Sequence, residues 1–411
     1  MNCKQYSILD LFKKRYNISG FKLDEAWYCE EETEDGVDCY VLVSLRQTRK
    51  TCDCPRCGGR VKTIEEEYER QVRDLDVQGT WCYVQFVERK IRCRCGYRGL
   101  EKLGFIRPYS RCTRDFERVV AGFCRELSIR EVSRQFHLDW KTVKEIDKQS
   151  IREGLHDLTM FSPMRIGVDE VAYEKGHRYL TVVRDVDLGC VIWVGVGRSK
   201  ETMDRFFIEL GVKRDDIMVC CMDMWDPFIA SVREWTSADI VFDKFHIAKK
   251  MNEALDGVRK KEFMDKDPAV RRLMKHKRFL ILRRKHNVPD DRREELESLL
   301  QANETLFKCY ILKEELLDIL DEPSPLDAIL RFTVWAKNIV DSGIQEFQTV
   351  IKTLKHYWYG IKNMFKYHLT NAGSEGFNNK IGLVKRRAYG FHDLEYFKLK
   401  IIQACGYKPS S

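Results

Sequence analysis

The segment from Arg165 to about Lys250 leaves few choices of fold, because strand-like and helix-like patterns alternate along it in a definite order. Three apolar, strand-like runs come first, at 164–169, 179–183 and 191–196. A helix, a strand, a second helix and a last strand follow, at 200–210, 217–222, 226–235 and 239–243. Three strands in hairpin succession followed by α-β-α-β predict one α/β sheet with helices packed on it.

This order of elements is that of the ribonuclease H-like fold, and two of its strands end in an aspartate. Asp169 ends the first strand, and Asp223 follows the strand at 217–222. An apolar strand that ends in Asp places a carboxylate at the carboxyl edge of the sheet, where sites form in α/β folds. Two such carboxylates could share divalent metal ions that activate water for an in-line displacement. Each aspartate alone would more often be a turn or capping residue.

Two pairs of cysteines in the first quarter of the chain predict a zinc ribbon. Each pair is followed by Gly, and strand-like residues lie between the pairs. Such knuckles on hairpins can close a tetrahedral site of four thiolates, so we expect a structural Zn²⁺ on Cys54, Cys57, Cys93 and Cys95. The second pair is C-x-C rather than C-x-x-C, and Cys52 could replace one ligand. Buried free thiols are the alternative.

Residues 128–147 predict a helix-turn-helix. Ser128 caps a first short helix, and Asp139 ends the turn and caps the second helix. The apolar residues of both helices fall on one side. The residues left outward at the start of the second helix are Lys141, Thr142 and Lys144. A recognition helix meets the major groove of DNA at this end, whereas an ordinary helical hairpin is the alternative.

Charge and hydropathy restrict the partners of the chain. The net charge is +8, and basic residues cluster in runs such as 271–272, 283–285 and 385–387. Clustered positive charge is typical of proteins that bind polyanions, although any single run could be a solvated helix face. The first ten residues lack the pattern of a secretory signal, and no apolar stretch approaches the roughly 20 residues that span a membrane. We therefore expect an intracellular protein with no membrane partner.

The chain resembles the insertion-sequence transposases of the ISL-three family, within the Asp/Asp/Glu transposases, over nearly its whole length. The most specific matching segments are 374–381 and 384–391, and others are 242–246, 253–259 and 73–76. By this resemblance the third acid of the family matches Glu375, and the first two match Asp169 and Asp223. The departures are the C-x-C knuckle and the residues at 372–374, and neither removes a carboxylate of the triad.

The resemblance implies a multidomain chain. We expect a β-rich region with the zinc ribbon over 1–110, in which strands at 26–29 and 40–45 flank an acidic turn from Glu30 to Asp38. A helix-turn-helix DNA-binding domain is expected over 111–160. The ribonuclease H-like catalytic domain would comprise 161–250 and 368–411, interrupted by an α-helical insertion over 251–367.

The resemblance also implies the activity: a DNA transposase that binds the ends of an insertion sequence and catalyses metal-dependent strand cleavage and strand transfer. Asp169, Asp223 and Glu375 would bind Mg²⁺, with Mn²⁺ as a substitute. Basic residues near Glu375 would neutralise phosphates beside the scissile bond, namely Lys380, Lys385, Arg386 and Arg387. The expected partners are transposon ends and target DNA, bound by a homodimer, with no small-molecule substrate. The protein would be cytoplasmic and associated with a bacterial nucleoid.

Two other functions stay open at this stage. One is a DNA-binding regulator that descends from such a transposase and lacks catalysis, and the other is a nuclease without strand transfer. Several residues near the acids have open roles. Asp243 and His246 could support the metal ligands, contact phosphate or only pack, Trp225 could line the rim or stack on a base, and Asn378 and Asn379 could orient Glu375 or touch DNA.

Overall fold

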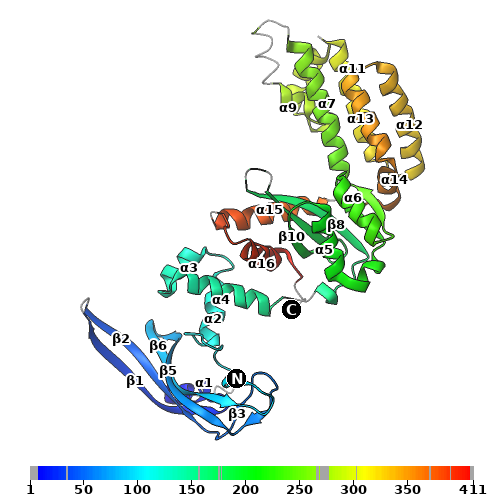
Figure 1. Cartoon of the computed structure of the whole chain (residues 1–411). Helices are drawn as coiled ribbons and strands as arrows, with labels where there is room; N and C mark the ends of the chain where they lie inside the picture. Colours follow the sequence, from blue (N-terminus) through cyan, green and yellow to red (C-terminus); the bar gives the residue numbers. More distant parts are fainter. Residues whose placement is uncertain are drawn as a thin grey trace, which may run out of the picture. The chain divides into compact units, whose positions relative to one another are not determined.

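The computed structural model describes residues 8–407 except 34–35, 156–157, 175, 177, 265–267, 269–276, 302, 370–371 and 389. The chain divides into two compact units, Met1–Gly154 and Leu155–Ser411, and each is described by itself (Figure 1). In the first unit, helix α1 (Ile8–Arg15) is followed by a five-stranded sheet. Its strands, in spatial order, are β1 (Phe21–Thr33), β2 (Gly36–Gln47), β6 (Thr80–Arg92) and β5 (Ile64–Val77), with β7 (Arg98–Leu100) paired to β6.

Strands β1 and β2 form the predicted hairpin, but they continue through most of the segment that we expected to be an acidic turn. Glu30 pairs with Cys39 and Glu32 pairs with Val37, so the expected turn from Glu30 to Asp38 is largely strand. The acidic side chains do not oppose this, because both strands are mostly exposed here and each satisfies the backbone of the other. Residues 34–35 lie outside the described part of the chain.

Three helices close the first unit: α2 (Arg114–Phe123), α3 (Ile129–Phe136) and α4 (Trp140–Glu153). They share a small core in which Phe116, Val132 and Val143 are completely buried. The last two helices are the pair that the sequence predicts as a helix-turn-helix.

The second unit contains a five-stranded sheet in the order β10-β9-β8-β11-β12. The strands are β8 (Arg165–Glu174), β9 (Arg178–Asp185), β10 (Cys190–Val196), β11 (Val219–Met222) and β12 (Asp239–Phe242). The first three are joined as antiparallel hairpins, whereas β11 runs parallel to both β8 and β12. Three hairpin strands followed by α-β-α-β are the elements expected of the ribonuclease H-like fold, and the predicted fold class is confirmed.

Helices cover both faces of this sheet. Successive side chains of a strand point to opposite faces, so strands that are apolar throughout need a cover on each face. On one face, Val168 and Val183 share a core with residues of α5 (Lys200–Leu210) and α6 (Asp226–Trp235). On the other face, Val182 packs in a cluster with residues of α15 (Ala372–Arg387) and α16 (Leu394–Cys405). Figure 1 shows α15 and α16 together on their side of the sheet.

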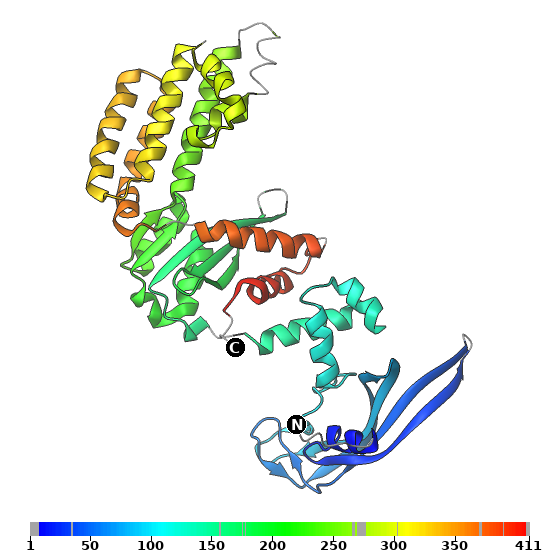
Figure 2. The same ribbon diagram turned by 180° about the vertical axis from the view of Figure 1, so that it is seen from behind.

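Between β12 and α15 the described chain is helical. The helices longer than four residues are α7 (Lys244–Met264), α9 (Arg278–Leu282), α10 (Arg293–Gln301), α11 (Glu304–Leu320), α12 (Pro325–Ser342), α13 (Gln345–His356) and α14 (Trp358–Tyr367). Helix α7 leads from the sheet into this bundle (Figure 2). It is one helix from Lys244 to Met264. No described helix is both long enough and apolar enough to cross a membrane.

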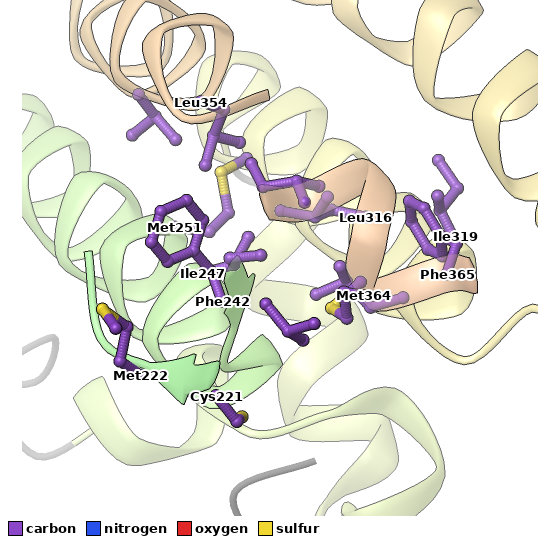
Figure 3. Packing of buried hydrophobic residues seen from close by; sticks show 14 of the residues in the cluster. Cys221, Met222, Phe242, Ile247, Met251, Leu316, Ile319, Leu354, Met364 and Phe365 are labelled. Atoms are coloured by element: carbon purple, nitrogen blue, oxygen red, sulfur yellow. The ribbon is translucent and has the colours of Figure 1, made fainter. Parts of the chain in front are cut away.

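The helical bundle and the sheet share one hydrophobic core. Figure 3 shows Phe242 of β12 packed close to Ile247 and Met251 of α7, with Met364 of α14 nearby. Gly360 of α14 lies against the ring of Phe242, where a Cβ atom would approach the ring to 2.4 Å. The bundle is therefore anchored at the strand from which it leaves.

Candidate active site

The register of the parallel strands brings three aspartates to one level of the sheet. Cys221 of β11 lies opposite Gly167 of β8, and Asp223 and Asp169 each lie two residues further along. Met222 of β11 lies opposite Phe242 of β12, and Asp243 is the next residue after that pair. Because these three strands run in the same direction, the three aspartates meet at the edge where α/β folds place their sites.

The sequence predicts that Asp169 ends its strand, but the strand continues beyond it. Strand β8 continues to Glu174 in an antiparallel hairpin with β9, whereas its pairing with β11 reaches only Gly167. The extension is favoured because Val171 and Tyr173 pack in the cluster formed with α15 and α16. Asp169 therefore lies where β8 loses its parallel neighbour, and its position at the site edge does not require the strand to stop.

Short contacts hold the side chains of this site. Asp169 accepts a hydrogen bond from the backbone N of Glu170 at 2.7 Å and another from Nδ2 of Asn378 at 2.7 Å. Nε2 of His246 lies 2.8 Å from Oδ1 of Asp223. Asp223, Asp243 and His246 each offer a ligand atom, and these atoms lie within 4.8 Å of one another. Carboxylate oxygens and imidazole nitrogens of this kind can bind a divalent metal ion.

The charges of the site perturb one another. Burial raises the pKa of Asp169, and the negative charge of Asp223 raises it further. The contact with the Asp223 carboxylate raises the pKa of His246 and outweighs the opposite effect of burial. Carboxylates that repel each other in this way favour a bound cation, since a divalent ion removes the repulsion.

Glu375 belongs to the first turn of α15, and its side chain lies outside the described residues. It precedes Asn378 by three positions in the same helix, and positions three apart share a face of a helix. Because Asn378 contacts Asp169, the helix that carries Glu375 is attached directly to the aspartate cluster. Nothing in the sequence between β8 and α15 indicates this contact, which joins residues 209 positions apart.

The four basic residues predicted to contact phosphates all lie on α15. Lys385 is half-buried, and its Nζ lies 3.4 Å from the backbone oxygen of Ala172 in β8. Lys380 and Arg386 are exposed, and so is Arg387 at the end of the helix. Helical periodicity puts Lys385 on the same side of α15 as Asn378 and puts Lys380 on the opposite side. The four basic residues therefore do not lie on a single face of the helix.

A buried arginine, Arg184, lies next to the aspartates. It is not among the site residues predicted from the sequence. Arg184 of β9 pairs with Gly167 across the strands and is only 6% exposed. Burial lowers its pKa, and the charges of Cys221, Asp169 and Asp243 oppose that effect. The available signal was Gly167 itself, because Gly inside a strand often marks the close approach of another group.

The four cysteines expected to bind zinc are brought together in the first unit. Their Sγ atoms lie within 4.8 Å of one another, with 3.7 Å from Cys54 to Cys95 and 3.7 Å from Cys57 to Cys93. Zn–S bonds of about 2.3 Å in a tetrahedron require S–S separations of about 3.8 Å, so the cluster has the size of a zinc site. Cys52 lies outside the cluster, where burial raises its pKa to about 11.

Glycine allows both cysteine knuckles to turn. Gly58 and Gly96 have φ angles of 68° and 85°, in the left-handed region that favours Gly. The amide of Gly58 donates to the oxygen of Cys54 and that of Gly96 donates to the oxygen of Cys93. The Gly that follows each cysteine pair is therefore required by the backbone.

The helix-turn-helix has the predicted caps. Ser128 and Glu131 form a reciprocal capping box on α3, and His137 ends that helix in the left-handed conformation. Asp139 accepts a hydrogen bond from the amide of Lys141 at 2.9 Å and so caps α4. Of the three residues predicted to meet DNA, Lys141 and Thr142 are exposed and Lys144 is half-buried.

Comparison with known proteins agrees with this arrangement. Residues 166–401 match the family model of the DDE transposases of family ISL3, described as a transposase. Residues 101–151 match the helix-turn-helix domain of transposase family ISL3, and residues 50–95 match the zinc-finger of transposase IS204/IS1001/IS1096/IS1165. These matches define an insertion-sequence transposase with a DDE catalytic domain. The chain belongs to the ISL3 family.

Individual relatives match along most of the chain. The transposase for insertion sequence element IS1001 of Bordetella parapertussis is 34% identical over 365 residues, which cover 87% of this chain and 90% of the relative. The transposase for insertion sequence element IS1557 of Mycobacterium tuberculosis is 25% identical over 412 residues, which cover 92% of each chain. The predicted family, fold class and transposase function are confirmed, and they imply DNA binding and a divalent metal.

Proposed function

We propose that Asp169, Asp223 and Glu375 are the catalytic carboxylates of this transposase and that they bind Mg²⁺, for which Mn²⁺ can substitute. The observation that carries the proposal is the strand register, which sets Asp169 and Asp223 at one level of the sheet. The contact between Asn378 and Asp169 supports the third member, because Asn378 belongs to the helix of Glu375.

The donor set suits this ion. Mg²⁺ prefers carboxylate oxygens and keeps water and phosphate oxygens as its other ligands. Repulsion between Asp169 and Asp223 raises the pKa of Asp169, and a bound cation relieves that repulsion. When bound, the metal supplies activation of water and stabilisation of the leaving oxygen in an in-line displacement at phosphorus.

Neighbouring residues position these carboxylates. Asn378 and the amide of Glu170 each donate to a different oxygen of Asp169, which fixes the plane of its carboxylate. His246 contacts Asp223, while Asp243 uses one oxygen to accept from the amide of Phe245 at the start of α7. We assign His246 as the group that orients Asp223. Asp243 lies beside both and is itself held by the start of α7.

We propose that DNA is the only substrate of the protein. Lys141, Thr142 and Lys144 would contact the transposon end, in agreement with their place at the start of α4. The basic residues of α15, Lys380, Lys385, Arg386 and Arg387, would neutralise phosphates of the transposon end or the target DNA. Two ends must be cut together, so we infer a homodimer on DNA that works at the nucleoid in the bacterial cytoplasm, with no small-molecule substrate.

We propose that each expected domain has a separate role. We assign the zinc ribbon to residues 1–110, the helix-turn-helix to 111–160, catalysis to 161–250 with 368–411, and the helical insertion to 251–367. The zinc ion would stabilise the ribbon and take no part in chemistry, because four thiolates fill its coordination sphere.

Strand cleavage and joining test the proposal. The substrate is a labelled duplex that carries the inverted repeat flanking the coding sequence, with Mg²⁺ and a supercoiled target plasmid. Glu375→Gln should lower both reactions roughly a thousandfold or more without loss of end binding. Glu304→Gln, also in the first turn of a helix, is the matched control and should react normally.

Other outcomes separate the alternatives. Cleavage without joined products would indicate a nuclease. Tight binding of the repeat by both the parent and the variant, with no cleavage by either, would indicate a DNA-binding regulator and would end the catalytic assignment.

A further inference from the structure

An arginine lies over two aromatic rings at the rim of the aspartate cluster. Arg198 follows β10, and its guanidinium carbon lies 4.2 Å from the ring centroid of Tyr179 and 4.7 Å from that of Trp225. Contacts at these distances are favourable cation–π interactions, and they restrict the long side chain to few rotamers. The position of this cation is therefore well defined before any ligand arrives.

The backbone of Arg198 is held as firmly as its side chain. The indole Nε1 of Trp225 donates to the backbone oxygen of Arg198 at 3.0 Å. The preceding residue, Gly197, donates to the oxygen of Tyr179 at 2.9 Å and accepts from Oγ1 of Thr181 at 2.7 Å. Gly197 has a φ of 104°, which only Gly adopts readily, so the turn that presents Arg198 depends on this residue.

Arg198 contacts residues that neighbour the proposed catalytic carboxylates in the chain. Trp225 follows Asp223 by two residues, and Glu170 follows Asp169 directly. Nη1 of Arg198 lies 3.4 Å from Oε2 of Glu170, which is long for a hydrogen bond between charged groups. The Arg198 side chain is 36% exposed and that of Glu170 is 16% exposed, so the guanidinium remains accessible from solvent.

We propose that Arg198 binds a phosphate of the DNA strand that enters the active site, and that Tyr179 and Trp225 hold it in place for this contact. The inference rests on the proposed function. A guanidinium that lies over aromatic rings keeps its in-plane N–H groups for hydrogen bonds, and these groups match the oxygens of a phosphodiester. A cation at this position adds to the effect of the bound metal, because positive charge beside the aspartate cluster attracts the negatively charged strand.

A pairwise substitution of protein and DNA tests this contact. The parent and Arg198→Gln would cut end duplexes in which one phosphate near the scissile bond is replaced by a neutral methylphosphonate. Arg198→Gln should slow cleavage of unmodified DNA roughly ten- to a hundredfold, as loss of a charged hydrogen bond does. At one phosphate position the methylphosphonate should slow the parent by a similar factor and leave Arg198→Gln unaffected.

Arg214→Gln is the matched control. Arg214 also lies over a ring, 4.9 Å from the centroid of Trp235, and it is 31% exposed. It precedes β11, whereas Asp223 follows that strand, so it lies at the opposite end from the site. This variant should cut at the parental rate and keep the parental response to every methylphosphonate.

The results that would overturn this inference differ from the results that would overturn the proposed function. If the parent cuts and Arg198→Gln cuts equally fast, or shows the parental methylphosphonate pattern, Arg198 does not bind the phosphate. If Arg198→Gln does not fold, Arg198→Met decides: it retains the aliphatic stem without the charge, and parental cleavage by it would also overturn the inference. Failure of the parent to cut would count against the catalytic assignment itself.

Discussion

At the scale of single residues, the site combines negative and positive charges that are too close to be independent. Asp169 lies two residues from Gly167 on the same face of β8, and Arg184 lies opposite Gly167. A buried guanidinium is stable only when charged or polar partners surround it. We therefore regard Arg184 as the internal counter-charge of the aspartate cluster, and Gly167 as the residue that leaves room for it.

Gly167→Ala tests this role. The added Cβ would lie 2.5 Å from Nε of Arg184, so the guanidinium or the strand must move. We expect a loss of about 1–3 kcal/mol in the free energy of unfolding, typical of overpacking, together with reduced cleavage. Urea denaturation and the cleavage assay measure the two effects.

The control for this substitution is Gly257→Ala in α7. The nearest atom to the added Cβ there would be Cγ of Glu346 at 3.6 Å, an ordinary contact. Since Ala favours helix over Gly, stability should stay the same or rise. Parental stability and parental cleavage in Gly167→Ala would contradict the role given to Arg184.

At the scale of elements, the zinc ribbon has only a small hydrophobic core. The two strands next to the first knuckle, β3 (Cys52–Asp53) and β4 (Arg60–Val61), contain two residues each. The buried cluster around them comprises Cys52, Cys54, Val61 and Ile91. A core this small rarely holds a fold, so bound metal should contribute much of the folding free energy.

Single serine substitutions test the ligand set. Cys95→Ser should remove one of four thiolates, lower the zinc content of the purified chain, and expose the ribbon to proteolysis. Cys52→Ser should keep a full equivalent of zinc, because Cys52 lies outside the cluster. Exposed Cys39 provides a neutral Cys→Ser control. Loss of zinc in Cys52→Ser together with normal zinc in Cys95→Ser would show that the assignment is wrong.

Several helices and strands could be predicted from the sequence. Local signals were sufficient for the helix-turn-helix, where Ser128 and Asp139 cap the two helices as expected. They were also sufficient for the order of the catalytic strands, because each strand is a short apolar run between turns. The length of β8 was not predictable, since its last residues are stabilised by α15, which lies far away in the sequence.

Contacts between distant segments were equally hidden. The sequence suggested that Asn378 could orient Glu375, yet the structure joins it to Asp169. Arg198 had no signal of its own, because its role depends on Tyr179 and Trp225 from two other segments. Such contacts depend on how segments that are distant in the sequence pack together.

At the scale of the whole chain, the zinc-finger and helix-turn-helix matches lie in the first compact unit, and the transposase match lies in the second. Within the second unit, the long helical segment between Asp243 and α15 does not separate the parts of the site. It leaves from β12 through α7 and returns to the same strand through α14, where Nδ2 of Asn363 donates to the oxygen of Ile240 at 3.0 Å. The insertion therefore begins and ends against the same strand of the sheet.

The most direct test of the account is whether Asp169 and Asp223 bind metal together. Mn²⁺ binding would be followed by electron paramagnetic resonance on the full chain in complex with the end duplex. Asp169→Asn and Asp223→Asn should each abolish the tight class of bound Mn²⁺, whereas Asp187→Asn, at the β9–β10 turn, should leave it intact. Tight binding that persists in both site variants would contradict the claim that the strand register builds the catalytic metal site.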